Sequence, residues 1–169
     1  SKGPVTVLIP LKTAELYDPQ SGTLDSLDNM PNDRAFHSAT ALPDGRVLVV
    51  GGFGNVAGNL TTLASALVVD LDQQDDIYSV QTTGIKQRVY HTATLLESRG
   101  VVVIAGGCSG LGCGVNGVTN GGGNNPTDAL REIDVFDVES SKMTSTGVLL
   151  SRGRAMHTAS ALRDGRVLF

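Results

Sequence analysis

The segment that decides the fold reads Arg34-Ala-Phe-His37-Ser-Ala-Thr-Ala-Leu42-Pro-Asp-Gly45-Arg-Val-Leu-Val-Val-Gly51-Gly52. It recurs as Arg88-Val-Tyr-His91-Thr-Ala-Thr-Leu-Leu96-Glu-Ser-Arg-Gly100-Val-Val-Val-Ile-Ala-Gly106-Gly107, and again as Arg154-Ala-Met-His157-Thr-Ala-Ser-Ala-Leu162-Arg-Asp-Gly165-Arg-Val-Leu-Phe169. All three histidines of the chain occupy the same slot of this motif. Tandem self-similarity of this kind is the signature of a repeat architecture.

Each copy of the motif predicts a β-hairpin. The small and β-branched residues after the histidine predict a short first strand. Pro43-Asp-Gly45 and Arg163-Asp-Gly165 are tight-turn sequences in which glycine supplies a positive φ. The apolar runs 47–50 and 101–105 have strand length and predict strands that are covered on both faces. A glycine pair then ends the run, where the backbone must turn sharply or approach a neighbour closely.

Weaker patterns around these hairpins predict further strands. The expected third strands are 13–18, 64–70 and 129–137, and the expected fourth strands are 23–27, 76–80 and 142–146. Residues 5–9 predict a second strand ahead of the first of these. No stretch of ten or more residues has a convincing helical period. The sequence therefore predicts an all-β chain.

Composition narrows the classes of partner. The 169 residues include 21 glycines, which favours many tight turns. The net charge of −4 makes the chain a poor general binder of nucleic acid. No apolar stretch approaches the length of a membrane span. The opening residues Ser1-Lys2-Gly3-Pro4 lack the apolar core of a signal peptide, so we expect any export signal to lie outside this chain.

Three elements together resemble the kelch repeat, in its bacterial and galactose-oxidase-like form. They are Arg-x-x-His-Ser/Thr-Ala, then Asp-Gly-Arg-Val-Leu-Val-Val-Gly-Gly, then Ala14-Glu-Leu-Tyr-Asp-Pro19. The resemblance recurs along nearly the whole chain and implies a β-propeller whose blades are four-stranded antiparallel sheets. One departure is the absence of the tryptophan usual in the fourth kelch strand. Leu24, Tyr78 or Ile77, and Met143 stand near those positions.

The resemblance implies about three blades in this chain. Residues 1–33 would supply the C-terminal strands of a first blade, 34–87 and 88–153 one full blade each, and 154–169 the first hairpin of another. Propellers close with four to eight blades. The chain is therefore either a fragment of a longer parent, which we favour here, or one of two copies that form a six-bladed ring. In such a ring the C-terminal hairpin of each copy would complete the N-terminal blade of the other.

The repeated arginines and histidines have two interpretations each. Arg34, Arg88 and Arg154 recur with the first strand, which favours a structural role. The alternative is a ring of guanidinium groups that binds carboxylates at the pore mouth. The repeated histidines favour polar spacers between blades over metal ligands.

Galactose-oxidase-like enzymes, which this repeat resembles, carry a copper-ligating Tyr-His pair in the slot that Tyr90-His91 occupies here. Copper-radical chemistry also needs a second tyrosine cross-linked to a cysteine and another histidine. Phe36 and Met156 fill the tyrosine slot in the other copies. We therefore expect no catalytic residues, no metal and no cofactor in this chain. A fragment of a copper-radical oxidase, or of another propeller-borne enzyme, is the alternative.

The function favoured by the sequence is a non-catalytic scaffold that binds a protein or a carbohydrate through its loop face. The expected ligand face contains Arg34, Phe36, Phe53, Arg88, Tyr90, Arg154 and Met156. A glycine-rich insert, 106–128, is either a binding loop or an inert insertion. It holds Cys108 and Cys113, which form a disulfide or remain two thiols. A disulfide and a surface rich in Gly, Asn and Thr favour an extracellular or cell-envelope location.

Overall fold

The structure, a computed structural model, describes residues 9–71, 76–110 and 129–169. The strands are β1 (Glu15–Asp18), β2 (Thr23–Ser26), β3 (Ser38–Ala41), β4 (Val47–Val50), β5 (Phe53–Val56), β6 (Asn59–Thr62), β7 (Ala66–Asp70), β8 (Asp76–Ser79), β9 (Gln81–Thr83), β10 (Thr92–Leu96), β11 (Val101–Ala105), β12 (Glu132–Asp137), β13 (Lys142–Leu149), β14 (Ser160–Ala161) and β15 (Val167–Leu168). The one helical element of the described residues is a single 3₁₀ turn, η1 (Glu97–Arg99). The all-β prediction is confirmed.

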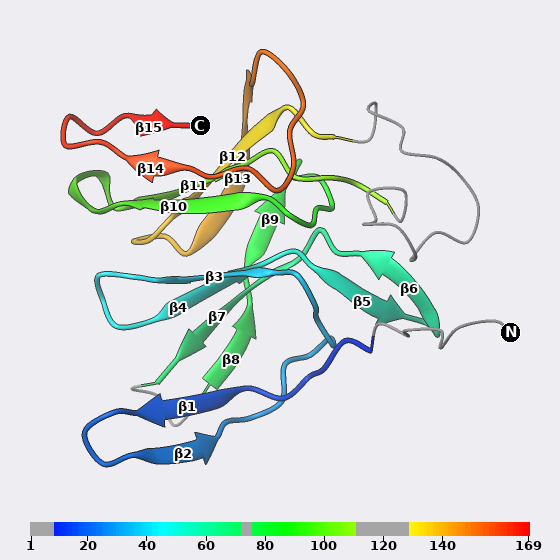
Figure 1. The fold of residues 1–169 in the computed structure, drawn as a ribbon, viewed down its shortest axis with the longest axis vertical. Helices are drawn as coiled ribbons and strands as arrows, with labels where there is room; N and C mark the ends of the chain where they lie inside the picture. The colour runs from blue at the N-terminus through cyan, green and yellow to red at the C-terminus, as the bar shows by residue number, and fades with distance from the viewer. Residues whose placement is uncertain (1–8, 72–75, 111–128) are drawn as a thin grey trace, which may run out of the picture.

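The strands form a row of sheets that lie beside one another in sequence order (Figure 1). Hairpin β1–β2 stands at one end, the antiparallel sheet β3-β4-β7-β8 is next, and β10-β11-β12-β13 follows with β9 on its outer edge. Hairpin β14–β15 stands at the opposite end. Two complete four-stranded antiparallel units are thus flanked by two hairpins.

Alternation along β4 explains how neighbouring sheets pack. Leu48 and Val50 point to one face and join Val102 and Ile104 of β11 in a single buried cluster. Val49 points to the other face and packs in a second cluster with Met30. Side chains of a strand alternate between faces, so an unbroken apolar run buries both sides of one sheet.

Several strand predictions need adjustment. The stretch after Gly52 forms an unpredicted hairpin, β5–β6, with Phe53 paired to Thr62. β9 pairs in parallel with β13, so residues 81–83 belong to the second complete sheet although we placed 34–87 in the first. The predicted strand 5–9 lies largely outside the described residues. The first strand of the third copy is reduced to β14.

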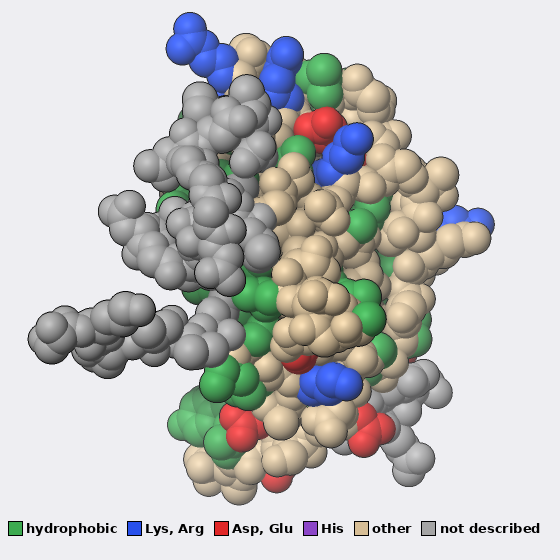
Figure 2. All heavy atoms as spheres, turned by 90° about the vertical axis from the view of Figure 1, so that its right-hand side faces the viewer, with side chains coloured by type: hydrophobic (Ala, Val, Ile, Leu, Met, Phe, Trp, Pro, Cys, Tyr) green, Lys and Arg blue, Asp and Glu red, His purple; other side chains and the backbone are tan. Residues whose placement is uncertain are grey.

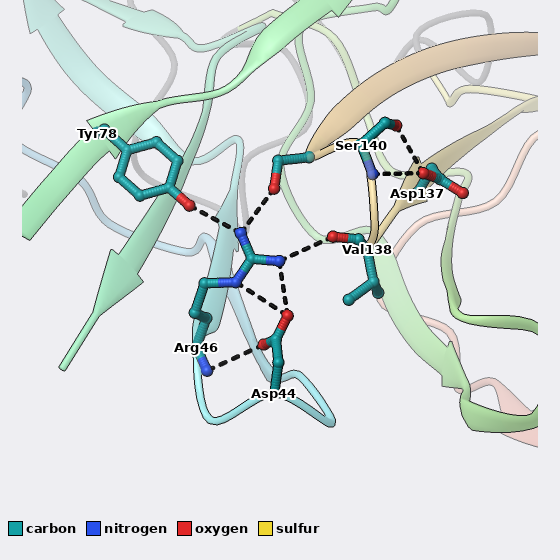
Figure 3. A network of polar contacts seen from close by, with 7 residues as sticks. Asp44, Arg46, Tyr78, Asp137, Val138 and Ser140 are labelled. Atoms are coloured by element: carbon teal, nitrogen blue, oxygen red, sulfur yellow. Dashed lines mark hydrogen bonds and ion pairs between the residues drawn. The ribbon is translucent and has the colours of Figure 1, made fainter. Parts of the chain in front are cut away.

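The two complete sheets are joined at their turn end by Arg46 (Figure 3). Its guanidinium donates to the Tyr78 hydroxyl at 2.8 Å, to Ser141 Oγ at 2.6 Å and to the Val138 carbonyl at 2.8 Å. Asp44, two residues earlier, holds the same guanidinium in an ion pair at 2.6 Å. Tyr78 belongs to β8 of the first complete sheet, whereas Val138 and Ser141 lie in the turn that joins β12 to β13 of the second. Arg46 therefore fixes the distance between sheets.

Arg46→Ala is expected to lower the free energy of unfolding by about 2 kcal/mol, because several hydrogen bonds to a mostly buried charged group disappear together. The matched control is Arg166→Ala. Arg166 occupies the same turn position in the third copy but pairs with Asp164 in solvent, 77% of its side chain being exposed. That variant should unfold at nearly the wild-type denaturant concentration. Equal losses of stability in a urea titration would show that Arg46 does not hold the two sheets together.

Candidate ligand-binding face

In the first two repeats, the residue after the arginine forms a β-bridge with the residue after the glycine pair. Ala35 and Phe53 exchange both main-chain hydrogen bonds, at 2.9 and 2.8 Å. Val89 and Cys108 do the same in the second repeat, at 3.0 and 2.9 Å. The residue after each arginine is thus paired with the residue after the glycine pair. This bridge presents the next residue of the repeat, Phe36 or Tyr90, at the same place in each unit.

The arginines of the first two repeats lie beneath this face. Arg34 is 3% exposed and Arg88 is 1% exposed. The Nη1 of Arg34 donates to the Gly51 carbonyl at 2.8 Å, and the Nη1 of Arg88 donates to the equivalent Gly106 carbonyl at 3.1 Å. Burial lowers the pKa of Arg34 to about 10, so that it stays cationic at neutral pH. These two side chains serve the fold, which favours the structural alternative over a pore-mouth ring.

Arg154 lies at the same position of the third repeat and is partly buried. Its carbonyl accepts the Gly107 N–H at 2.8 Å, as the carbonyl of Arg88 accepts the Gly52 N–H at 2.9 Å. The main chain at each of these arginines therefore docks on the glycine pair of the preceding repeat.

Phe36, Tyr90 and Met156 share an unusual backbone conformation. Their φ angles are 58°, 56° and 55°, in the left-handed region. For a side chain other than glycine this region costs about 1 to 2 kcal/mol. We call these three residues the apolar row. Nothing in one copy of the motif signals the conformation, since Phe, Tyr and Met have no preference for it, and sequence reasoning missed it.

The apolar row is held at the surface. Phe36 is 47% exposed and Met156 is 57% exposed. The rings of Phe36 and Tyr90 lie 5.0 Å apart, and each is 6.2 Å from the ring of Phe53. Phe53 is itself 1% exposed and forms the floor under the row. The Met156 N–H donates to the Tyr90 carbonyl at 2.9 Å, so Met156 lies next to Tyr90 in the row.

The predicted ligand face thus divides into two layers. Phe36, Tyr90 and Met156 reach solvent, while Phe53, Arg34 and Arg88 support them from below. Hydrophobic side chains gather in the middle of the face that looks out past β5–β6, and charged side chains lie mainly toward its upper and lower ends (Figure 2). Phe36 and Met156, which are about half exposed, are therefore the apolar members of the predicted face that a ligand can reach, whereas Arg34 and Arg88 are buried.

The histidines connect one repeat to the next. His91 Nε2 lies 2.8 Å from Ser38 Oγ of the preceding repeat, and His157 Nε2 lies 3.3 Å from Thr92 Oγ1. The Nδ1 atoms of both rings are buried without a hydrogen-bond partner among the described residues. Burial, helped by Arg88, lowers the pKa of His91 to about 3. This neutral imidazole occupies the spacer role that the sequence favoured.

The neutral state of His91 predicts an acid-sensitive fold. The unfolded chain binds a proton at this residue near pH 6.5, whereas the folded chain does so only near pH 3. Stability is therefore complete above about pH 6.5 and falls as the pH drops. We expect a loss of about 1.5 kcal/mol between pH 6.5 and 5, a window above most carboxylate titrations. His91→Gln should flatten the slope of unfolding free energy against pH, and an unchanged slope would contradict the assignment.

The remaining predicted features are only partly covered by the described residues. Cys108 is buried and disulfide-bonded. Its predicted partner Cys113 and most of the insert 106–128 lie outside those residues, so the pairing stays a prediction. Within the described ranges no three His, Cys, Asp or Glu side chains are grouped as a metal site. No helix found there is long and apolar enough to cross a membrane.

No protein-family model matches the chain, and no curated protein matches it.

Proposed function

We propose that this chain is a segment of a kelch-like β-propeller that acts as a non-catalytic binding scaffold. Its ligand, a protein or a carbohydrate, would contact the apolar row. The observation that carries the proposal is the row itself. Large apolar side chains stand in a left-handed conformation at one slot of three successive repeats, with Phe36 and Met156 about half exposed.

The strain of the row supports a functional interpretation. Residues held in sparsely populated backbone regions cost of order 1–3 kcal/mol each and cluster at binding and catalytic sites. Glycine or asparagine would satisfy the same backbone at lower cost. The side chains at these slots are instead Phe, Tyr and Met, of which the two aromatic ones contact each other. Aromatic rings supply large, rigid contact area to protein partners and stacking faces to sugars.

The polar groups around the row support binding rather than chemistry. The terminal nitrogens of Arg34 and Arg88 donate to Gly51, Ser65, Gly106 and Asp134, whereas Arg34 Nε is buried without a hydrogen-bond partner among the described residues. His91 is engaged by Ser38 and is neutral. These groups hold the backbone that presents the row. The disulfide at Cys108 supports an extracellular or cell-envelope location, because such bonds persist in oxidising compartments.

The test is a glycan array and an immobilised peptide library, probed with the intact chain and with Phe36→Asn and Met156→Asn. Asparagine tolerates the left-handed backbone while removing the apolar side chain. Both variants are expected to weaken the selected ligand at least about tenfold. They should also stay folded, because the relief of backbone strain offsets part of the packing energy that the larger side chain supplied. The matched control is Val148→Asn, since Val148 of β13 is 59% exposed, much as Met156 is, but lies outside the row.

Three results would contradict the proposal. The first is binding that the Phe36 and Met156 variants leave unchanged. The second is the absence of any ligand from both screens, which favours a purely architectural spacer. The third is stoichiometric copper in the purified protein together with a visible absorbance band, which would favour the oxidase alternative.

A further inference from the structure

The chain contains one triplet of the form Asn-x-Ser/Thr in which x is not proline, Asn59-Leu60-Thr61. The other Asn-x-Thr triplet, Asn125-Pro126-Thr127, has proline at the middle position, which the motif excludes. The first triplet is the acceptor motif for N-linked oligosaccharides, which are bulky and need a surface position in the folded chain. Because so short a motif also occurs by chance, the place of Asn59 in the fold decides whether it is a site.

Asn59 lies at the tip of hairpin β5–β6. β5 ends at Val56 and β6 begins at Asn59, and these two residues are directly opposite each other across a two-residue turn. Both turn residues have a positive φ, 51° at Ala57 and 81° at Gly58, as in the tight turns that close two-residue hairpins. The hairpin extends beyond the ends of β3 and β4 (Figure 1). Residues 55–59 are all exposed, so the tip offers the surface turn that an oligosaccharide needs.

The register of β6 separates the side chains of the triplet. Side chains alternate along a strand, so Asn59 and Thr61 share one face of the hairpin and Leu60 points to the other. Leu60 is half-buried and packs against the buried cluster that contains Phe53 and Cys108. The fold therefore uses the middle residue, which the motif leaves free apart from proline. The two residues that the motif requires lie on the face turned away from that cluster.

The acceptor nitrogen of Asn59 makes a local contact at the surface. Its Nδ2 donates to the carbonyl of Ala57 at 3.3 Å, a long and exposed hydrogen bond within the turn. An amide nitrogen that carries a sugar keeps one N–H, so this contact can persist after modification. Attachment of a sugar at this atom therefore disrupts no buried hydrogen bond of the hairpin.

The disulfide at Cys108 supports the second requirement, which is a chain that enters a secretory pathway. Cys108 is disulfide-bonded, and such bonds persist in oxidising compartments. N-linked sugars are likewise a feature of secreted chains. The inference therefore rests on the extracellular location proposed above, and it does not depend on ligand binding by the apolar row.

We propose that Asn59 is an N-glycosylation site, whose donor is an oligosaccharide linked to a polyprenyl diphosphate. Transfer forms a bond between Nδ2 of Asn59 and the anomeric carbon of the first sugar. It breaks the bond between that carbon and the diphosphate oxygen, which leaves with the electron pair, and Nδ2 loses one proton to a base of the transferase. Asn59 pairs with Val56, three residues along β5 from Phe53, which is about 10 Å at the usual rise of a strand. The sugar therefore stands away from the floor of the apolar row.

The test is expression of the intact chain behind an export signal in a eukaryotic host, with mass spectrometry before and after an amidase that releases N-linked glycans. The wild-type chain should lose the mass of one oligosaccharide, and the amidase should leave aspartate at position 59. Thr61→Val should abolish the modification, because it removes the hydroxyl that the motif requires and keeps a β-branched residue in the strand. The matched control is Thr61→Ser, which keeps the hydroxyl and should keep the glycan. Asn59→Gln should carry none.

Secreted chain and chain retained in the cells are both analysed, so that poor export does not hide the result. An unmodified wild-type chain in both fractions, a glycan that persists in Thr61→Val or Asn59→Gln, or its loss in Thr61→Ser would each overturn the assignment. Circular dichroism before and after glycan release should be the same, and a difference would show that the sugar disturbs the sheets. Attachment is read from mass alone, so a failure of the proposed ligand binding would be seen separately.

Discussion

Gly51→Ala is expected to lower the free energy of unfolding by about 3 kcal/mol. Gly51 has a φ of +63°, and an added Cβ would overlap the main-chain carbonyl oxygen of Arg88 in the next repeat. The left-handed conformation costs alanine about 1 kcal/mol, and overpacking against a backbone atom that cannot rotate away adds about 1–3 kcal/mol. His91 Cε1, 3.1 Å from the same Cβ position, leaves no room to shift toward the ring.

Gly100→Ala is the matched control for this prediction. Gly100 has a φ of +62°, nearly identical to that of Gly51, but nothing lies within 4 Å of its added Cβ. It should therefore lose only the conformational part, about 1 kcal/mol. The free energies of unfolding of both variants, measured by chemical denaturation, separate the cost of the left-handed backbone from the cost of the steric overlap with Arg88. Equal losses would mean that the next repeat does not press on the glycine pair, and the packing of repeats described above would be wrong.

Arg88→Met is expected to lower the free energy of unfolding by about 3–5 kcal/mol, because it leaves the Asp134 carboxylate buried without its cation. Both side chains are 1% exposed and form an ion pair. Burial raises the pKa of Asp134 above its usual value, although Arg88 opposes the shift. Without Arg88 the carboxyl is more readily protonated. Because its folded pKa then lies above the unfolded value, the penalty should be largest at neutral pH and smaller near pH 4.

Two further variants identify the origin of that loss. Arg88→Met combined with Asp134→Leu removes both charges and should recover much of the stability. Arg34→Met tests the same slot in the first repeat, where the described acceptors are the neutral oxygens of Gly51 and Ser65. It should cost less than Arg88→Met and show no recovery at acid pH. If the double variant is less stable than Arg88→Met in urea denaturation, the loss does not come from the unpaired Asp134 carboxylate.

The hairpins and their order were accessible from sequence because they depend on local chemistry. Asp-Gly turns, apolar runs of strand length and glycine pairs each determine the structure of a few residues. Their recurrence in three copies makes the prediction of a repeated hairpin more specific. The third and fourth strands followed for the same reason, to within a few residues of β7, β8, β12 and β13. The close approach expected at the glycine pairs is confirmed by the carbonyl of Arg88 against Gly51.

The features that sequence reasoning missed depend on tertiary context. β9 joins the second complete sheet through a parallel pairing with β13, a contact that no local pattern at 81–83 encodes. Hairpin β5–β6 lacks the alternation that marks a half-buried hairpin, because Phe53 and Gly54 are buried while Asn55 and Val56 are exposed. The left-handed φ of Phe36 is imposed by the Ala35–Phe53 bridge on one side and strand β3 on the other.

The sequence supplied the seven residues proposed for the ligand face, but it did not separate the exposed members from the buried ones. Sequence could not show that Arg34 and Arg88 turn inward, because an arginine on a strand is equally compatible with solvent and with buried carbonyls. Leu162 and Leu168 of hairpin β14–β15 likewise have the sequence pattern of core residues, yet they are 39% and 63% exposed in the structure.

The Arg-x-x-His segments of the second and third repeats each dock on the repeat before them. A high-resolution crystal structure of the chain tests this docking most directly. We expect His91 Nε2 on Ser38 Oγ and His157 Nε2 on Thr92 Oγ1, with the carbonyls of Arg88 and Arg154 accepting the N–H groups of Gly52 and Gly107. Imidazoles in unrelated surroundings, or sheets that do not face one another through β4 and β11, would contradict it.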